Sequence, residues 1–182
     1  MPAGYPRDIG PYPEIRVSFS TSPVFAWVAS ADPTPRDEHY GSWPVLKQSH
    51  KNENVRALQW FVNCTGHRLD TPSVFGPKTH AAVRTFQSRH VPPADGIVGA
   101  RTWLTLLSRD LPAGHTQRND CVKALQVLLN KWRYDDDLPI TGYHGDRTRK
   151  KLLRFQREHG LPAHGDADTP TYHKLLATPA GK

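Results

Sequence analysis

The sequence contains only two cysteines and one methionine in 182 residues, and it has no long apolar run. The two cysteines, Cys64 and Cys121, cannot build the multiple-disulfide framework of a small secreted scaffold. They can form one bridge or stay as buried thiols, and the sequence leaves both outcomes open. Crossing a bilayer takes about 20 consecutive apolar residues, so we expect no membrane span.

Short catalytic and metal-binding motifs are also missing. The chain has ten histidines, yet it contains no His-Glu-x-x-His, no Cys-x-x-Cys and no Gly-x-Ser-x-Gly. The turn from His164 to Asp168 carries candidate ligands but lacks the further ligands of a metal site. We therefore predict no metal, no cofactor and no enzymatic activity.

What the sequence does have is positive charge. Its 24 Lys and Arg residues exceed its 17 Asp and Glu residues and give a formal net charge of +7. Such a surface suits an anionic partner. Nucleic acid, an anionic membrane surface and bacterial wall polymers fit equally well on charge alone.

The chain also contains an internal repeat. Residues 55–59, Val-Arg-Ala-Leu-Gln, recur at 122–126 as Val-Lys-Ala-Leu-Gln, and the two copies match without a gap from Gly76 and Gly145 onward. A two-residue insertion falls in the loop 134–140 of the second copy, where length changes are tolerated. We interpret the repeat as a duplication, with copy one at 45–108, a linker at 109–118 and copy two at 119–178.

Each copy is predicted to form three helices. The first begins at Asn52 or Asn119, both good N-caps, and carries apolar residues at spacings of three and four. The second begins after Gly76 or Gly145, and the third covers about 100–107 or 170–176. The expected fold is therefore mainly α, with two tandem orthogonal three-helix bundles.

Residues 1–44 match neither copy and are rich in proline, which disfavours helix. We expect an irregular or extended arm that docks on a protein partner. A mildly apolar run at 17–28 precedes Ala29-Ser30-Ala31, which has the small-x-small form of a signal-peptide cleavage site. Serines and a proline interrupt that run, so we favour an arm, and the question of a signal peptide stays open.

The combined motif resembles the peptidoglycan-binding domain, type 1. Copy one carries it as Val55-x-x-Leu58-Gln59, Phe75-Gly76-x-x-Thr79, Ala82-Val83-x-x-Phe86-Gln87 and Asp95-Gly96-Ile97-Val98-Gly99-x-x-Thr102-Trp103-x-x-Leu106. The resemblance implies a small bundle that docks bacterial wall material. Copy two departs from the motif at His144, His164 and Asp168, in the loops that would line a ligand groove. Copy one is therefore predicted to be the better binder.

Two sets of candidate site residues follow. A wall ligand needs an apolar or aromatic shelf and a few directed polar groups, and the expected set is Asp70, Ser73, Phe75, Gln87, Arg89, Asp95 and Trp103. In copy two, Lys150, Arg154 and Arg157 share one helix face with no acid between 147 and 157. We predict that this face meets an anionic partner.

The function expected from the sequence is non-catalytic peptidoglycan binding. The protein would anchor itself or a larger assembly to the wall, outside the cell or as part of a particle that acts there. The alternative is a structural or interaction component, for example of a phage or injection particle, that kept the fold and lost glycan binding. A nucleic-acid partner is disfavoured, because the basic helix lacks interleaved aromatic residues for base stacking.

Overall fold

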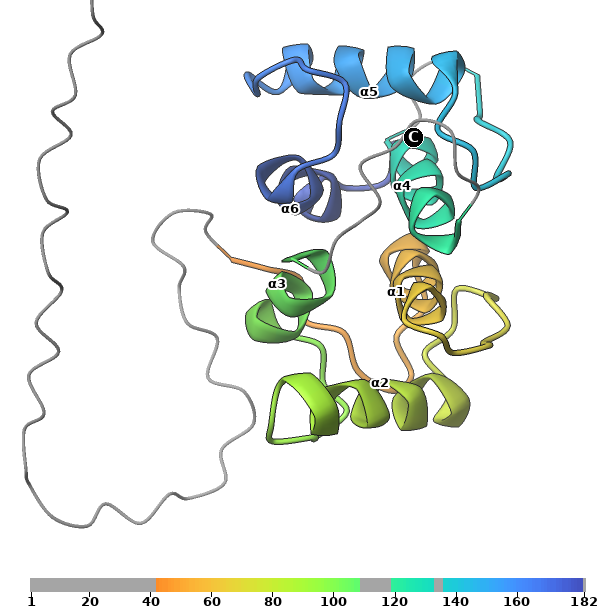
Figure 1. The fold of residues 1–182 in the computed structure, drawn as a ribbon, viewed down its shortest axis with the longest axis vertical. Coiled ribbons are helices and arrows are strands. Elements are labelled where there is room, and N and C mark those ends of the chain that lie inside the picture. The colour runs from red at the N-terminus through yellow and green to blue at the C-terminus, as the bar shows by residue number, and fades with distance from the viewer. Residues whose placement is uncertain (1–41, 109–118, 133–135, 182) are drawn as a thin grey trace, which may run out of the picture.

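The computed structural model describes residues 42–108, 119–132 and 136–181. The predictions for residues 1–41 and for the linker 109–118 lie outside the described residues. The described part contains six helices, which confirms the mainly α fold. They are α1 (Glu53–Cys64), α2 (Pro77–His90), α3 (Ala100–Ser108), α4 (Asp120–Lys131), α5 (Asp146–Glu158) and α6 (Thr169–Ala177) (Figure 1).

The helix starts follow from local capping, as the sequence predicted. The Oδ1 atom of Asn52 accepts a hydrogen bond from the Val55 amide at 3.0 Å, and that of Asn119 accepts one from the Val122 amide at 2.8 Å. Each cap satisfies one of the backbone donors that a helix N-terminus leaves unpaired. The two copies thus begin with the same local signal.

The two copies pack against each other through α1 and α4. These helices lie in the middle of the molecule, while α2 and α5 lie at opposite ends and α3 lies near α6 (Figure 1). Asn54 near the start of α1 contacts Lys131 at the end of α4, and Cys64 at the end of α1 contacts Cys121 near the start of α4. The two helices therefore run antiparallel.

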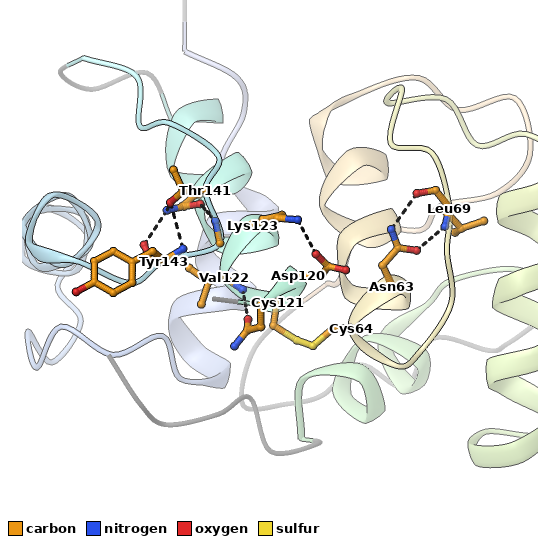
Figure 2. Close-up of polar contacts among 12 residues, drawn as sticks. Asn63, Cys64, Leu69, Asp120, Cys121, Val122, Lys123, Thr141 and Tyr143 are labelled. Atoms are coloured by element: carbon orange, nitrogen blue, oxygen red, sulfur yellow. Dashed lines mark hydrogen bonds and ion pairs between the residues drawn. A yellow bond between two sulfur atoms is a disulfide. The ribbon is translucent and has the colours of Figure 1, made fainter. Parts of the chain in front are cut away.

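A disulfide joins the copies at one end of this helix pair. Cys64 and Cys121 are bonded, with their Cα atoms 5.5 Å apart (Figure 2). This answers the question that the sequence left open. Near this bridge, the amine of Lys123 lies 4.3 Å from the ring centre of Trp60 across the same interface.

One apolar core runs through both copies. Phe61 of α1 meets Trp103 of its own copy edge-on at 6.3 Å between ring centres, and it meets Tyr172 of copy two at 5.4 Å. All three side chains are buried. Aromatic pairs of this kind contribute about 0.5–1.5 kcal/mol beyond the area that they bury, so Phe61 couples the two bundles.

The last residues of the predicted arm belong to this packed body. Trp43 is buried and meets the ring of His173 in α6 at 4.6 Å, and the Pro44 carbonyl accepts a hydrogen bond from Trp103 Nε1 at 2.8 Å. Residues 42–44 thus connect both copies. Within the described ranges, none of the helices combines the length and the apolar character that a bilayer crossing requires.

Candidate binding grooves and basic hollow

A buried glutamine holds the loop between the first two helices of each copy. Gln59 Nε2 donates to the Val74 carbonyl at 2.9 Å and to Thr79 Oγ1 at 3.0 Å. Gln126 Nε2 makes the equivalent bonds in copy two, to the Tyr143 carbonyl at 3.0 Å and to Thr148 Oγ1 at 3.2 Å. Each glutamine thereby ties the loop to the first turn of the second helix.

An asparagine fixes the other end of the same loop. Asn63 donates to the Leu69 carbonyl at 2.9 Å and accepts from the Leu69 amide at 2.7 Å (Figure 2). Asn130 makes the same pair of bonds with Leu138, both at 2.8 Å. Because both clamps have the same form, Leu69 and Leu138 are equivalent positions. The two-residue insertion of copy two therefore lies between Asn130 and Leu138.

Between these two anchors, copy one has a groove of about 470 Å³, which we name groove one. Its walls are mainly apolar, and the exposed side chains of Asp70 and Lys78 approach each other to 3.9 Å at its rim. Such an exposed ion pair is weak, so both groups can turn to a ligand. Groove one is lined by Gln59, Leu69, Asp70, Pro72, Val74, Gly76, Pro77, Lys78 and Thr79.

Copy two has a second groove, of about 250 Å³, at the same place. Each residue of this groove two is the repeat partner of one residue of groove one. The loops that carry the two grooves lie on the right of Figure 1, one toward each end of the molecule. Groove two is lined by Gln126, Leu138, Pro139, Thr141, Tyr143, Gly145, Asp146, Arg147 and Thr148.

The two grooves differ in chemistry. Tyr143 takes the position of Val74 and is 44% exposed, so groove two has an aromatic wall that groove one lacks. In groove two, Gln126 Oε1 accepts from the Gly142 amide at 3.0 Å. In groove one, Gln59 Oε1 is buried and has no hydrogen-bond partner within the described part of the chain. Groove one therefore keeps an unused acceptor beneath its surface.

Comparison with known proteins places this repeat in a family. The family model described as "Putative peptidoglycan binding domain" matches the chain twice, over residues 51–106 and 118–175. The chain belongs to the peptidoglycan-binding domain family. Both matched segments contain one groove each, and both are binding domains by the description of the family.

Similar proteins include a zinc D-Ala-D-Ala carboxypeptidase of Streptomyces albus G, 39% identical over 48% of this chain and 35% of its own length. An uncharacterized protein of Kitasatospora aureofaciens is 42% identical over 36% of this chain and 57% of its own. An N-acetylmuramoyl-L-alanine amidase of Bacillus licheniformis is 28% identical over 70% of this chain and 36% of its own. The chain therefore spans between about a third and three fifths of these relatives. No solved structure gives a significant match.

Three residues of the predicted ligand set are interior residues of this peptidoglycan-binding domain. Phe75, Gln87 and Trp103 are 1%, 2% and 0% exposed. Phe75 and Trp103 pack in the core, and Gln87 donates to the Ile97 carbonyl at 2.7 Å and accepts from the Gly96 amide at 2.8 Å. The structure does not offer these side chains to a ligand, because the core and the loops already use them.

The other four residues of that set do not form one site. Asp70 lies at the rim of groove one, and the Ser73 hydroxyl donates to Glu53 at 3.2 Å. Asp95 accepts from Gln87 and from the Ile97 amide, and Arg89 is exposed near the end of α2. The 14 residues of α2 separate these two groups, by roughly 20 Å at 1.5 Å per residue. Asp70 is the member that the structure places in a groove.

The predicted anionic-partner face lines a third hollow of about 630 Å³, which we name the basic hollow. Arg154 pairs with Glu158 at 3.0 Å, and the buried Lys151 amine donates to the Asp136 carbonyl at 3.0 Å. Leu138 and Arg147 line both this hollow and groove two, so the two are adjacent. The basic hollow is lined by Asp136, Leu138, Arg147, Lys150, Lys151, Leu153, Arg154 and Arg157.

The sequence prediction missed the groove residues Lys78, Tyr143 and Arg147. Lys78 and Arg147 occupy matching positions after the helix-capping glycines, so the repeat itself contained their signal. Tyr143 follows Gly142, whose φ of +74° places it in a tight turn. The exposure of the tyrosine depends on that turn, which the family motif does not specify.

Proposed function

We propose that this protein is a non-catalytic binder of peptidoglycan that attaches itself, or an assembly to which it belongs, to the bacterial wall. The observation that carries the proposal is the pair of grooves, which are lined by equivalent positions of the two copies. A groove kept in both copies of a peptidoglycan-binding repeat is the natural place for a common ligand.

The chemistry of the grooves supports this assignment. Peptidoglycan offers sugar rings with apolar faces, peptide amides and free carboxylates. Apolar walls with a few polar groups suit such a ligand, and Tyr143 gives groove two an aromatic surface against which a sugar ring can pack. Lys78 and Arg147 give each groove one cation for a carboxylate. We propose that these residues, together with Asp70, contact the ligand.

The disulfide supports a location on the wall side of the membrane. Disulfides persist in oxidising compartments and are rare in the reducing cytosol of most organisms. Both cysteines of this chain are used in the bridge. The relatives that are named as wall enzymes agree with this location.

Retention on purified, protein-free sacculi tests the proposal. Sacculi stripped of attached anionic polymers isolate the contribution of the glycan and its peptides. We expect retention that survives high salt, because directed contacts resist screening and bare charge attraction does not. We also expect Tyr143→Ala and the double change Asp70→Ala/Lys78→Ala each to reduce retention, and their combination to abolish it.

Matched controls are available in the same chain. Val45 is exposed and apolar like Tyr143 but lies outside both grooves, and Arg101 is an exposed cation on α3. Val45→Ala and Arg101→Ala should therefore bind as the wild type does. If the combined groove variant stays folded and binds equally well, the grooves are not the site. Release of soluble glycan or peptide by the isolated protein would refute the non-catalytic part of the proposal.

The alternative, a structural component that lost glycan binding, predicts a different result. In that case the wild-type protein would not be retained on stripped sacculi at any salt concentration. The smaller volume of groove two and the motif departures of copy two favour this alternative for that copy. Comparing the retention of Tyr143→Ala with that of Asp70→Ala/Lys78→Ala measures how much each copy contributes to wall binding.

A further inference from the structure

The basic hollow has more positive charge than its own contacts neutralise. Arg147, Lys150 and Arg157 are exposed, and none of them has an ion-pair partner among the residues that the structure describes. Arg147 and Lys150 lie three residues apart on α5, a spacing that brings their like charges close together. An anion in the hollow would remove this repulsion.

The fold does not require these charges. In copy one, the positions equivalent to Lys150, Arg154 and Arg157 are Ala81, Thr85 and Ser88. Helix α2 nevertheless contacts α1 in copy one as α5 contacts α4 in copy two, and the two helices lie at opposite ends of the molecule (Figure 1). The charge is thus a property of copy two and not of the family fold, which points to a ligand specific to this copy.

The position of the hollow indicates what the ligand is attached to. The basic hollow and groove two share Arg147 and Leu138 as a common wall. A glycan chain lying in groove two would therefore bring any anionic substituent directly to the hollow. Ten residues separate Arg147 from Arg157, about 15 Å along the helix, so the cations fit a series of anionic groups better than a single one.

We propose that copy two binds a phosphate-bearing wall glycan, with the glycan in groove two and its phosphodiester groups in the basic hollow. This inference rests on the proposed peptidoglycan binding. Arginine presents a planar fork of donors that matches phosphate oxygens, and three of the cations in the hollow are arginines. Among the residues that the structure describes, no aromatic side chain on which a nucleic-acid base could stack lines the hollow.

Sacculi in two states provide the test. One preparation keeps its phosphodiester-linked polymer, and the other is stripped of it with cold hydrofluoric acid. We expect the wild type to bind the phosphate-bearing wall about tenfold more tightly, equivalent to one good charged contact. Lys150→Gln/Arg157→Gln should lose this preference and bind the stripped wall as before. Arg101→Gln/Lys174→Gln removes two exposed cations outside the hollow and should keep the preference.

The outcomes separate the two proposals. If the wild type is retained on stripped sacculi and binds phosphate-bearing sacculi no more tightly, phosphate binding in the basic hollow is refuted. Glycan binding in the grooves is then still supported. Retention on phosphate-bearing sacculi alone overturns glycan binding in the grooves. Equal loss in both double variants indicates general charge attraction and overturns the hollow. Binding of duplex or single-stranded DNA at the same salt and with the same affinity also overturns it, since the site would then not be selective for wall phosphate.

Discussion

Lys131 donates a hydrogen bond from its amine to Oδ1 of Asn54 at 2.7 Å, across the interface between the two copies. The repeat equates Lys131 with Cys64 and Asn54 with Cys121. The hydrogen bond and the disulfide therefore occupy equivalent positions at the two ends of the antiparallel α1–α4 pair. The Cys64–Cys121 disulfide links the two helices at one end, and the hydrogen bond from the buried Lys131 amine links them at the other.

Removing the disulfide should lower stability without dissolving the helices. Cys64 and Cys121 are 57 residues apart, and closing a loop of this length contributes about 4 kcal/mol in the chain-entropy model. Cys64→Ala/Cys121→Ala should therefore melt at a markedly lower temperature in a circular-dichroism scan. Its helix signal at 25 °C should persist, because the Phe61 contacts with Trp103 and Tyr172 do not depend on the bridge. Adding reductant should shift the wild type toward the variant and leave the variant unchanged.

The buried amine at the other end should make stability depend on pH. Burial lowers the pKa of Lys131 from 10.5 to about 8, against the opposing effect of the Glu53 charge. Between pH 8 and 10.5 the unfolded chain therefore binds more protons at this site than the folded chain, and the free energy of unfolding rises with pH. Relative to Lys131→Met, the wild type should gain about 2 kcal/mol between pH 7 and pH 10.

Denaturant titrations of both proteins at the two pH values measure this difference. Other titrating groups are common to the two chains and cancel in the comparison. Neither chain has a free thiol to exchange with the disulfide at high pH. A wild-type advantage that stays constant with pH would show that Lys131 keeps its ordinary pKa.

The helices were predictable because their signals are local. Asn52 and Asn119 cap the helices that follow them, and the repeat supplied each prediction twice. The packing of α1 on α4 was not predicted, because the spacing of three and four indicated a single buried stripe, which on α4 is formed by Val122, Leu125 and Leu129. The structure also buries residues on the other sides of this helix. Cys121, Val127 and Leu128 are apolar and lie outside that stripe, so the signal for a second buried face was present and unused.

The predicted ligand set failed to come together for a different reason. The family motif contains aromatic residues, and the sequence alone does not tell whether each one lies in the core or on the surface. Trp103 is held in the core by a hydrogen bond to Pro44, a residue far away in the chain. The basic face was predictable because its spacing on one helix decided it. That it borders groove two depends on where the loop before α5 places Leu138, which only the structure reveals.

Gln87 in α2 and Gln156 in α5 are buried, and replacing either one should lower the free energy of unfolding by a similar amount. Gln87→Leu would leave the Gly96 amide and the Ile97 carbonyl without their partner, and each unsatisfied buried group costs about 1–3 kcal/mol. Gln156→Leu would do the same to the Gly165 amide and the Asp166 carbonyl. Both variants should lower the denaturant midpoint by similar amounts.

The core shared by the two copies also predicts how many unfolding transitions these variants show. Because Phe61 contacts both copies, damage to either copy should destabilise the whole protein, and unfolding should stay a single transition. Two separate transitions in Gln87→Leu or Gln156→Leu would mean that the bundles fold independently, despite the disulfide between them.

Of the glycines near groove two, Gly142 should be the one whose replacement lowers the free energy of unfolding most. Gly142 has a φ of +74°, and a Cβ atom there would lie 2.7 Å from the backbone oxygen of Asn119. Gly160 has a similar φ of +67° but open space around it, so it controls for the backbone conformation alone. We expect Gly160→Ala to cost about 1–2 kcal/mol, the usual penalty of the left-handed region.

Gly142→Ala should cost clearly more than Gly160→Ala, because a clash with backbone cannot be relieved by rotating a side chain. The loop would have to move, and with it Tyr143 and the hydrogen bond from the Gly142 amide to Gln126. Chemical denaturation of the two variants compares the costs. If Gly142→Ala weakens retention on stripped sacculi while Gly160→Ala does not, the loss follows from the displaced wall of groove two. Equal stability and equal binding in both variants would mean that the turn adapts and that groove two does not depend on it.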